Sequence, residues 1–550
     1  LYIRDDSGGL LVGCFEPIGK AINPDRLGPD FSFQLLEEDW DHFEPMLKNA
    51  LHRLPVLQQA EARMLLNGPE SFTPDGSFLL GETGETRGLF LGCGMNSVGV
   101  ASAGGAGMAL ARCIVEGQFP MDLHELDPKR FPDCFNSAQS LAERVPEVLG
   151  KHYEITFPGR QWNTARNLRF TPLHQRWCEK NAYFGQFYGW ERPLFFDCEK
   201  QPVLSFERPQ WFEQVGKEVA LAHSKAAIFD QSTFGKIRVS GIDAETFLNR
   251  VCANAMDRPP GSVIYTGMLN ERGGFISDLT VQRIATDDYL LFVGTSAIKH
   301  DLVWLNSHVK PGERVRLINQ TDELATVGLM GQESEALMAS LGVDDVNTLG
   351  YFRHREYIVG GIPLRAARLS YVGECGWEFT CRSNDVSKLY DLLRSEGAQP
   401  AGLFAQTSMR VEKAYLSYGH DLDTDINPID SGLDFAVDWN SDFIGKQALQ
   451  VAQQAPLLKT RVSIMVNDPK ANPIGNEPVY YDGQIVGQTT SAAFGFRVGC
   501  PVAIAYLKTE YFDHPEDLIV ELDLAGNRAE GRVVVGAVFD PSGTRLMKKS

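Results

Sequence analysis

The chain has 550 residues, 43% of them hydrophobic and 22% charged, and its formal net charge is −19. This length exceeds a single hydrophobic core and predicts roughly two to four domains of ordinary globular composition. The acidic balance argues against a nucleic-acid partner, because proteins that grip phosphate backbones need a basic surface. No apolar run approaches the ~18 residues of a membrane span, and no secretory signal is visible.

The ten cysteines are scattered, with no C-x-x-C pair and no Cys–His spacing typical of zinc. In so large a chain this pattern favours thiols in a reducing compartment. The first residue is Leu1 rather than Met, and "LYIRDDSGGLLVG" is typical of the middle of a β-hairpin. We therefore expect the chain to begin inside a longer protein, with any targeting segment upstream.

Residues 1–130 predict short strands and two helices. Apolar residues alternate around the turn-rich tip "DDSGG", which indicates a hairpin, and "DHFEPMLKNALHRLPVL" has helical spacing limited by Pro45 and Pro55. "GLFLGCG" is typical of a buried strand. The apolar residues that follow it form a helix face, for which Gly117 is a natural end.

A glycine-rich stretch, "CGMNSVGVASAGGAG", joins this strand to this helix. In this stretch and at the end of the strand before it, the backbone carries no side chain at six positions: Gly92, Gly94, Gly99, Gly104, Gly105 and Gly107. Bare backbone lets a flat ligand approach, and a helix that begins near Ser102 would point free N–H groups at the negative edge of a reduced flavin. The alternative is a tight strand–helix crossover held by close packing.

Residues 131–170 are mixed and polar but retain aromatic residues, so we interpret them as a wrapping connector rather than a flexible linker. Beyond them, "WFEQVGKEVALAHSKAAIFD" predicts a helix running into a strand, and Asp243 opens a short helix. "YTGMLNERGGFISDLTVQRIATDDYLLFVG" predicts an antiparallel meander. After about Asp438 the chain becomes β-rich, with a hairpin turn at Asp482–Gly483.

Asp278 is the first candidate for chemistry. It follows a Gly-Gly turn in an otherwise apolar strand, and alternation puts it on one face with Ile276. If that face points inward, a buried carboxylate beside a turn suits proton handling or the binding of a ligand N–H group. The alternative is a face that meets solvent.

Glu378 is the second candidate. In "LSYVGECGWEF", Tyr371, Glu374 and Glu378 surround two glycines, and Trp377 and Phe379 flank Glu378. A carboxylate beside an aromatic slot pairs with an amino-pyrimidine edge; the alternative is a strand with one polar face. The acids and His420 of "SMRVEKAYLSYGHDLDTDINPID" suggest a metal, but the spacing fits no calcium loop, and we expect a solvated turn.

Several long motifs follow one another in the same order as in a known protein family. "CGMNSVGVASAGGAG" followed by "ELDPKRF" resembles the end of the flavin domain of dimethylglycine and sarcosine dehydrogenases, and of the related pyruvate dehydrogenase phosphatase regulatory subunit. "TPLHQRWCEKNAYFGQFYGWERP", "IFDQSTFGKIRVSG", "YVGECGWEF" and "SMRVEKAYLSYGHDL" resemble their folate-binding half, which is similar to the aminomethyltransferase (T-protein) of the glycine cleavage system.

The resemblance implies an α+β multi-domain protein with no metal site. Its parts would be the end of a discontinuous flavin-binding α/β oxidoreductase domain (1–130), a connector (131–170), a T-protein-like folate domain (171–440) and a C-terminal β-barrel (441–550). The glycine stretch would then be the second flavin contact, with the G-x-G-x-x-G fingerprint upstream. Flavin contacts would lie at Gly92, Gly94, Asn96, Ser97, Gly99, Gly104 and Gly105.

The resemblance also implies a reaction. FAD would take a hydride from an N-methyl amino acid, and tetrahydrofolate would capture the resulting iminium carbon; without folate, water would yield formaldehyde. Asp278 resembles the family's catalytic carboxylate, Tyr265 and Tyr371 its folate-site tyrosines, and Glu378 the acid that holds the pterin. An electron acceptor or a second copy of the chain would be a partner, in a bacterial cytoplasm or a mitochondrial matrix.

Two alternatives remain beside this demethylase. One is a regulatory subunit that kept the fold without turnover. The other is a folate-dependent aminomethyltransferase, against which the glycine stretch argues. Gln406 stands where stand-alone aminomethyltransferases have arginine, and this weakens a lipoyl-protein transfer reaction.

Overall fold

The computed structural model describes residues 1–343, 345–512 and 514–547. The chain divides into two compact units, which we describe separately. The smaller comprises Leu1–Pro120, Glu125–Thr156 and Arg160–Leu168, and the larger comprises Met121–His124, Phe157–Gly159 and Arg169–Ser550. Across the described ranges, no helix combines the length and apolar character needed to cross a membrane.

The smaller unit contains the predicted hairpin, strand and helices. β1 (Tyr2–Asp6) pairs antiparallel with β2 (Gly9–Gly13), and β3 (Leu79–Glu82) pairs with β4 (Phe90–Cys93). α1 (Trp40–Arg53) retains Pro45 within it and ends just before Pro55. α2 (Gly99–Glu116) ends at Gly117, whose left-handed φ of 76° confirms the predicted stop.

A further helix lies in the predicted connector. α3 (Ala138–Lys151) begins after Ser137, whose side chain accepts a hydrogen bond from the Ser140 amide at 3.0 Å. Ser137 is a typical N-cap and was the available signal for this helix. The segment is therefore more regular than its polar composition indicated.

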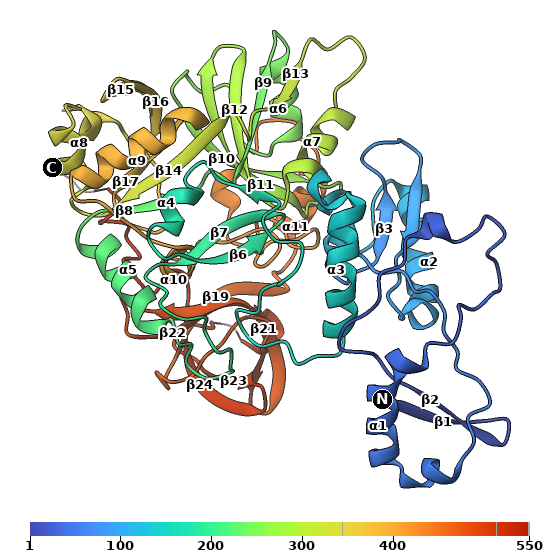
Figure 1. Cartoon of the computed structure of the whole chain (residues 1–550). Helices are drawn as coiled ribbons and strands as arrows, with labels where there is room; N and C mark the ends of the chain where they lie inside the picture. The colour runs from blue at the N-terminus through green and yellow to red at the C-terminus, as the bar shows by residue number, and fades with distance from the viewer. Residues whose placement is uncertain (344, 513, 548–550) are drawn as a thin grey trace. The chain divides into compact units, whose positions relative to one another are not determined.

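The predicted meander forms three consecutive strands, from one edge inward, of a five-stranded antiparallel sheet in the larger unit (Figure 1). Its order is β10 (Val263–Leu269), β11 (Phe275–Ala285), β12 (Asp288–Val293), β9 (Gly235–Ser240) and β13 (Arg316–Asn319). Alternate strand residues such as Leu279 and Val281 pack with α6 (Ala244–Val251) and α7 (Ile298–Ser307) in one hydrophobic core.

A second sheet has six strands. Its order is β15 (His354–Val359), β16 (Ile362–Ala367), β17 (Gly376–Arg382), β14 (Leu324–Met330), β8 (Ala227–Asp230) and β18 (Gln399–Pro400). The strands are antiparallel except that β18 pairs parallel with β8. Trp377 and Phe379 pack in a core with residues of α4 (His174–Cys178), α8 (Ser334–Ser340) and α9 (Val386–Ser395). In each sheet, the strand residues next to the candidate carboxyl point into the core. Asp278 and Glu378 therefore project from the other face of their own sheet, away from that core.

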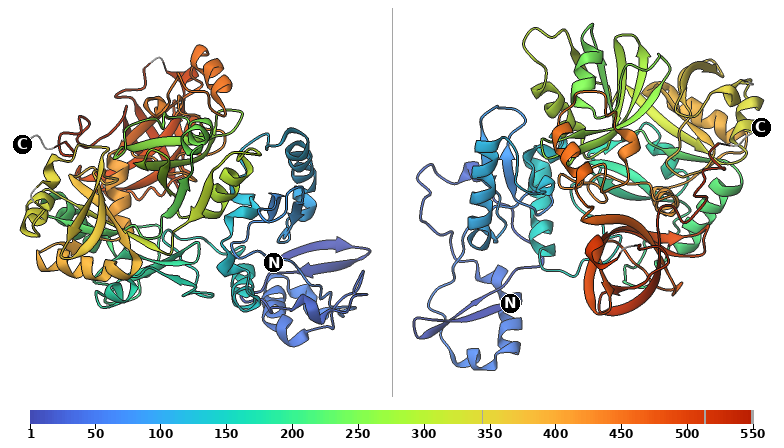
Figure 2. Two further views of the ribbon diagram at one scale, coloured as in Figure 1. Left: turned by 90° about the horizontal axis from the view of Figure 1, so that it is seen from above. Right: turned by 180° about the vertical axis from the view of Figure 1, so that it is seen from behind.

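The chain ends in a closed barrel, which confirms the predicted C-terminal β-rich domain (Figure 2). The barrel order is β19 (Lys459–Val466), β22 (Cys500–Lys508), β21 (Gln484–Gly495), β20 (Pro478–Tyr481), β23 (Ile519–Leu524) and β24 (Asn527–Val534). Asp482 and Gly483 form the predicted turn, with φ of 48° and 74°. Among the barrel strands that the structure describes, closure pairs both edges, so none has an edge free to pair with another chain.

The remaining elements of the larger unit connect these parts. A three-stranded sheet of β5 (Arg169–Phe170), β7 (Trp190–Phe195) and β6 (Tyr183–Phe187) precedes the predicted helix α5 (Phe212–Ser224). α10 (Leu403–Glu412) lies beside the barrel strand β21, and α11 (Lys446–Gln454) leads into β19. Together these helices hold the barrel to the sheets.

Candidate functional site

The glycine stretch forms a tight turn between β4 and α2. Gly94, Asn96 and Ser97 have positive φ of 70°, 46° and 69°. The Asn96 side chain is buried; its Oδ1 accepts from the Thr73 amide at 3.3 Å, and its Nδ2 donates to the Gly76 carbonyl. Asn96 thus holds the turn in place rather than presenting its side chain to a ligand.

The helix after this turn begins at Gly99, three residues earlier than the Ser102 start predicted from the sequence. Gly92 lies in β4, while Gly104 and Gly105 lie inside α2, where an added Cβ would meet nothing within 4 Å. Val98 is the residue before the helix, and its side chain cannot accept a hydrogen bond. The first backbone N–H groups of α2 therefore have no side-chain cap. An uncapped 18-residue helix fits a ligand with negative charge, as the flavin edge would be.

Asp278 lies on β11 opposite Gly267 of β10. Its carboxyl Oδ2 accepts a hydrogen bond from the Tyr265 hydroxyl at 3.0 Å. Asp278 and Ile276 are both partly buried, whereas the alternate residues Ser277 and Leu279 are fully buried. Ile276 packs against the core that contains Leu279, whereas Asp278 keeps a partly buried position beside Tyr265.

The electrostatics of this pair favour proton exchange near neutral pH. Loss of surrounding water raises the pKa of Asp278 to about 6, and the nearby Asp301 and Asp421 carboxylates add to the rise, while the Tyr265 hydrogen bond opposes it. Burial, with the Asp278 charge, raises the pKa of the Tyr265 hydroxyl. Tyr265 therefore remains a hydrogen-bond donor, and Asp278 is the group of this pair that changes its protonation state.

Tyr371 joins the same neighbourhood. Burial raises the pKa of its hydroxyl to about 12, and the charges of Arg410, Asp278 and Asp421 all act on it. The hydroxyl donates to the Leu416 carbonyl at 2.7 Å, and the ring stacks on Tyr415 with centroids 6.1 Å apart. The structure thus brings Tyr265, Asp278 and Tyr371 together and fixes the Tyr371 ring by both contacts.

Glu378 lies on the other large sheet and is almost fully buried. Burial raises the pKa of its carboxyl to about 7, and a hydrogen bond from the Gln231 side chain opposes the rise. The expected aromatic slot is wrong: Trp377 and Phe379 point into the hydrophobic core on the other face, because successive strand residues alternate.

The Glu378 environment nevertheless fits a ligand that offers N–H and amino groups. Gln231 Oε1 is buried and has no hydrogen-bond partner among the residues described. A buried amide oxygen without a partner is costly, so a donor is expected to meet it. With the neighbouring carboxylate it forms the acceptor pair that an amino-pyrimidine edge would require.

Arg410 and Asp421 are the functional candidates that sequence reasoning missed. The solvated turn expected around them is wrong, because Arg410 Nη1 donates to Asp421 Oδ2 at 2.9 Å and both side chains are buried. The Tyr506 hydroxyl donates to the Asp421 carbonyl at 2.8 Å from the barrel strand β22. The sequence signal for this ion pair was an acid eleven residues after an arginine. His420, from the same stretch, is exposed. In the portion of the chain that is described, no His, Cys, Asp or Glu cluster is arranged to hold a metal.

Family models match most of the chain. The FAD dependent oxidoreductase model matches residues 1–113 and its central-domain model residues 116–171. The GCVT N-terminal domain model matches residues 173–441, and the glycine cleavage T-protein C-terminal barrel model matches residues 459–540. These matches confirm the predicted fold class, an oxidoreductase domain followed by a T-protein-like domain and a barrel.

Individual relatives agree with the models. Human mitochondrial dimethylglycine dehydrogenase is 31% identical over 100% of this chain and 65% of its own length. The formaldehyde-forming 4-methylaminobutanoate oxidase of Paenarthrobacter nicotinovorans is 32% identical over 99% of this chain and 67% of its own length. The mouse mitochondrial pyruvate dehydrogenase phosphatase regulatory subunit is 31% identical over 97% and 64%. The chain thus spans about two thirds of the length of these relatives.

A solved structure supports the second half of the chain. The glycine cleavage system aminomethyltransferase T of Bartonella henselae superposes with a TM-score of 0.59 at 25% identity, covering 68% of this chain and 98% of that one. We conclude that the chain belongs to the family in which an FAD-dependent oxidoreductase is joined to glycine-cleavage T-protein domains, the family of dimethylglycine and sarcosine dehydrogenases and the pyruvate dehydrogenase phosphatase regulatory subunit.

Proposed function

We propose that this protein is an FAD- and tetrahydrofolate-dependent oxidative demethylase of N-methyl amino acids of the dimethylglycine or sarcosine type. The observation that carries the proposal is the hydrogen-bonded Tyr265–Asp278 pair, in which a carboxyl with a pKa of about 6 lies in the T-protein-like half of the chain. A carboxyl of this kind exchanges a proton near neutral pH, which one-carbon transfer to a folate nitrogen requires.

The oxidoreductase segment would contribute binding and charge stabilisation. When bound, FAD supplies a hydride acceptor. The chain's own part is the uncapped N-terminus of α2, where backbone N–H groups face developing negative charge, and the Asn96-anchored turn that keeps them in position. Of the expected flavin contacts, Gly92, Gly94 and Gly99 expose backbone with no side chain of their own, whereas the Ser97 hydroxyl donates to Glu70 Oε1.

The T-protein-like half would bind the folate and handle its proton. Tetrahydrofolate supplies a nitrogen nucleophile for the one-carbon unit. Glu378 and Gln231 accept the N–H groups of the pterin edge, and Tyr371 offers a ring face. The Asp278 carboxyl takes or returns a proton at a ligand nitrogen, while the Tyr265 hydroxyl, which donates to its Oδ2, holds the carboxyl in one orientation.

The test is a titration of the native protein with tetrahydrofolate, followed by turnover with dimethylglycine and sarcosine and an artificial electron acceptor. We expect binding, and we expect methylenetetrahydrofolate in place of formaldehyde when folate is present. Asp278→Asn should reduce methylenetetrahydrofolate formation by about 10²-fold or more, as loss of a general acid–base group does. Asp287→Asn is the matched control, because Asp287 is an exposed turn residue on the same hairpin.

Absence of tetrahydrofolate binding would overturn the folate half of the proposal. A second function, a regulatory subunit without turnover, is favoured by one observation: the similarity to the phosphatase regulatory subunit covers 97% of this chain. Flavin-loaded native protein that oxidises neither dimethylglycine, sarcosine nor 4-methylaminobutanoate, yet still binds tetrahydrofolate, would favour that function.

A further inference from the structure

A cavity of about 590 Å³ lies in the larger unit, apart from the candidate site residues. Neither the Tyr265–Asp278 pair nor Tyr371 or Glu378 lines it. Its walls come from both large sheets, from residues of β9, β11 and β12 on one side and of β14, β16 and β17 on the other. This volume is within the range of small-molecule sites, roughly 300–1,000 Å³.

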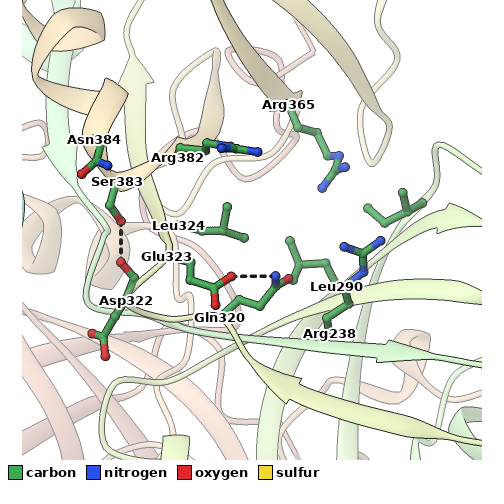
Figure 3. Close-up of a pocket in the computed structure, with 11 residues that line it drawn as sticks. Arg238, Leu290, Gln320, Asp322, Glu323, Leu324, Arg365, Arg382, Ser383 and Asn384 are labelled. Atoms are coloured by element: carbon green, nitrogen blue, oxygen red, sulfur yellow. Dashed lines mark hydrogen bonds between the residues drawn. The ribbon is translucent and has the colours of Figure 1, made fainter.

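Three arginines from three different strands line this cavity. Figure 3 shows the guanidinium groups of Arg238, Arg365 and Arg382 pointing toward the same space. Their orientation follows from strand alternation, because neighbours such as Ile237 and Cys381 point into the cores on the opposite sheet faces. Each guanidinium is permanently charged and presents a planar fork of donors that matches a carboxylate or phosphate.

The donors of these arginines are only partly used. Arg365 Nη2 donates to Glu356 Oε1 at 2.9 Å, but Glu356 is 75% exposed, and Arg365 Nε is buried with no partner among the described residues. Arg382 has no side-chain hydrogen bond or ion pair within the described part of the chain. Surface ion pairs such as that of Arg365 are weak, so a ligand oxyanion can displace the exposed partner.

Of the two acidic residues that line the cavity, Asp322 is engaged outside it and Glu323 is held by the neighbouring Gln320, so three guanidinium groups face a single carboxylate. Asp322 pairs with Arg169, and Figure 3 shows its carboxylate pointing away from the three guanidinium groups. Glu323 Oε2 accepts from Gln320 Nε2 at 3.0 Å. The buried Leu290, with Leu324, supplies an apolar wall beside the arginines. The cavity therefore offers cationic donors next to an apolar surface.

We propose that this cavity binds a small organic anion, in which a carboxylate or phosphate group meets Arg365 and Arg382 and an apolar body lies against Leu290 and Leu324. Arg365 Nε and Arg382, which have no partner among the described residues, make the first contacts. Arg238 keeps its two hydrogen bonds to Asp288 and adds a third positive charge. This site is distinct from the proposed folate site and does not depend on the proposed demethylase function.

The test uses benzoate, phenyl phosphate and neutral benzamide, three probes that share one ring and differ in the attached group. Calorimetric titration of the native protein at low ionic strength limits screening of the arginines. We expect at least one anion to bind and benzamide not to bind. A preference for phenyl phosphate identifies a phosphate ester as the ligand class, and a preference for benzoate identifies a carboxylate.

Variants connect the binding to this cavity. Arg365→Met and Arg382→Met should each weaken anion binding by about tenfold or more, since each removes a charge-assisted contact. Arg355→Met is the matched control, because Arg355 lies on β15 of the same sheet, outside the cavity, and pairs with Asp345. Arg382 is exposed, so its variant tests the site even if Arg365→Met folds poorly.

Four results would overturn the proposal. They are no binding of either anion, equal binding of benzamide, affinities unchanged in both arginine variants, and loss of anion binding when tetrahydrofolate saturates the protein. The last result would place the probes in the folate site. Unchanged anion binding in Asp278→Asn, together with the loss in Arg382→Met, would support a separate site.

Discussion

At the scale of single residues, two carboxyls stand out because neither forms an ion pair among the described residues. Asp278 accepts a hydrogen bond from Tyr265 and lies near Asp301 and Asp421, with Arg410 close enough to interact with its charge. Glu378 accepts a hydrogen bond from the Gln231 amide. Asp421, by contrast, pairs with Arg410 at 2.9 Å. Burying an unpaired carboxyl is unfavourable, and such groups gather where a protein needs a proton near neutral pH.

Tyr265→Phe tests the hydrogen bond to Asp278. The Tyr265 hydroxyl lowers the Asp278 pKa, so its removal should raise that pKa above about 6. If transfer requires the ionised carboxylate, the acid limb of the pH–rate profile for methylenetetrahydrofolate formation moves to higher pH. Tyr511→Phe, at an exposed tyrosine, is the control. An unmoved acid limb in Tyr265→Phe would contradict the assignment of that limb to Asp278.

Glu378→Gln tests the pterin contact through pH. The pKa of Glu378 is about 7, above its ordinary value, so the carboxylate that accepts N–H groups forms only as pH rises through 7. Tetrahydrofolate affinity should therefore fall about tenfold for each pH unit well below 7 in the natural protein. The glutamine variant should bind more weakly at pH 8 and lose this dependence. Equal pH slopes in both proteins would show that Glu378 does not contact the folate.

At the scale of elements, α2 and β11 each combine a structural face with a candidate functional one. Ser277 of β11 donates to the buried Asp301 of α7 at 2.7 Å, while the next residue, Asp278, turns toward the other side. This bond fixes the strand from behind the candidate carboxyl. In α2, Ala106, Ala109 and Cys113 are buried, whereas Gly104 and Gly105 are exposed.

Gly105→Ala and Gly117→Ala should change stability in opposite directions. An added Cβ at Gly105 meets nothing within 4 Å, so alanine should stabilise α2 by about 0.5–1 kcal/mol through lower unfolded-state entropy. Gly117 has φ of 76°, where alanine is strained, and the change should destabilise by about 1 kcal/mol. Urea denaturation followed by circular dichroism measures both. A destabilising Gly105→Ala would mean that this face of α2 is covered in the native protein.

At the scale of the whole larger unit, a buried ion network joins distant segments. Glu374 is fully buried and accepts hydrogen bonds from Arg497 at 2.9 Å and Arg545 at 2.8 Å, and it contacts His223 on α5. Arg497 also pairs with the buried Glu412 at the end of α10. The network thus connects the segment between β16 and β17, which also contains Tyr371, with α5, the barrel and Arg545 near the end of the described residues.

Glu374→Ala should destabilise the protein by about 3–5 kcal/mol, because removing one partner leaves buried guanidinium charge uncompensated. The control is Glu521→Ala, whose pair with Arg528 is exposed and should contribute less than about 1 kcal/mol. Denaturant unfolding monitored by tryptophan fluorescence measures both variants. Similar effects of the two substitutions would show that the network is not a main source of stability.

The sequence by itself determined the order of domains, the strand–turn–helix around the glycine stretch, the three-stranded meander and the barrel. These follow from local patterns: alternation, helical spacing and turn residues act within a few positions of one another. The helix α3 was not predicted, because the polar composition of its segment favoured an irregular connector and Ser137 was not recognised as an N-cap. Alternation placed Asp278 beside Ile276 on one face, and long motifs identified the family.

Only the tertiary structure decided what each candidate faces. The side chains of Trp377 and Phe379 adjoin Glu378 in sequence but point into another core, and Asp421 meets Arg410 instead of water. The arginines of the cavity lie 127 and 17 positions apart in the chain, since Arg238, Arg365 and Arg382 belong to different strands. Burial and charge pairing depend on long-range packing, and a strand pattern specifies which residues share a face but not what packs against that face.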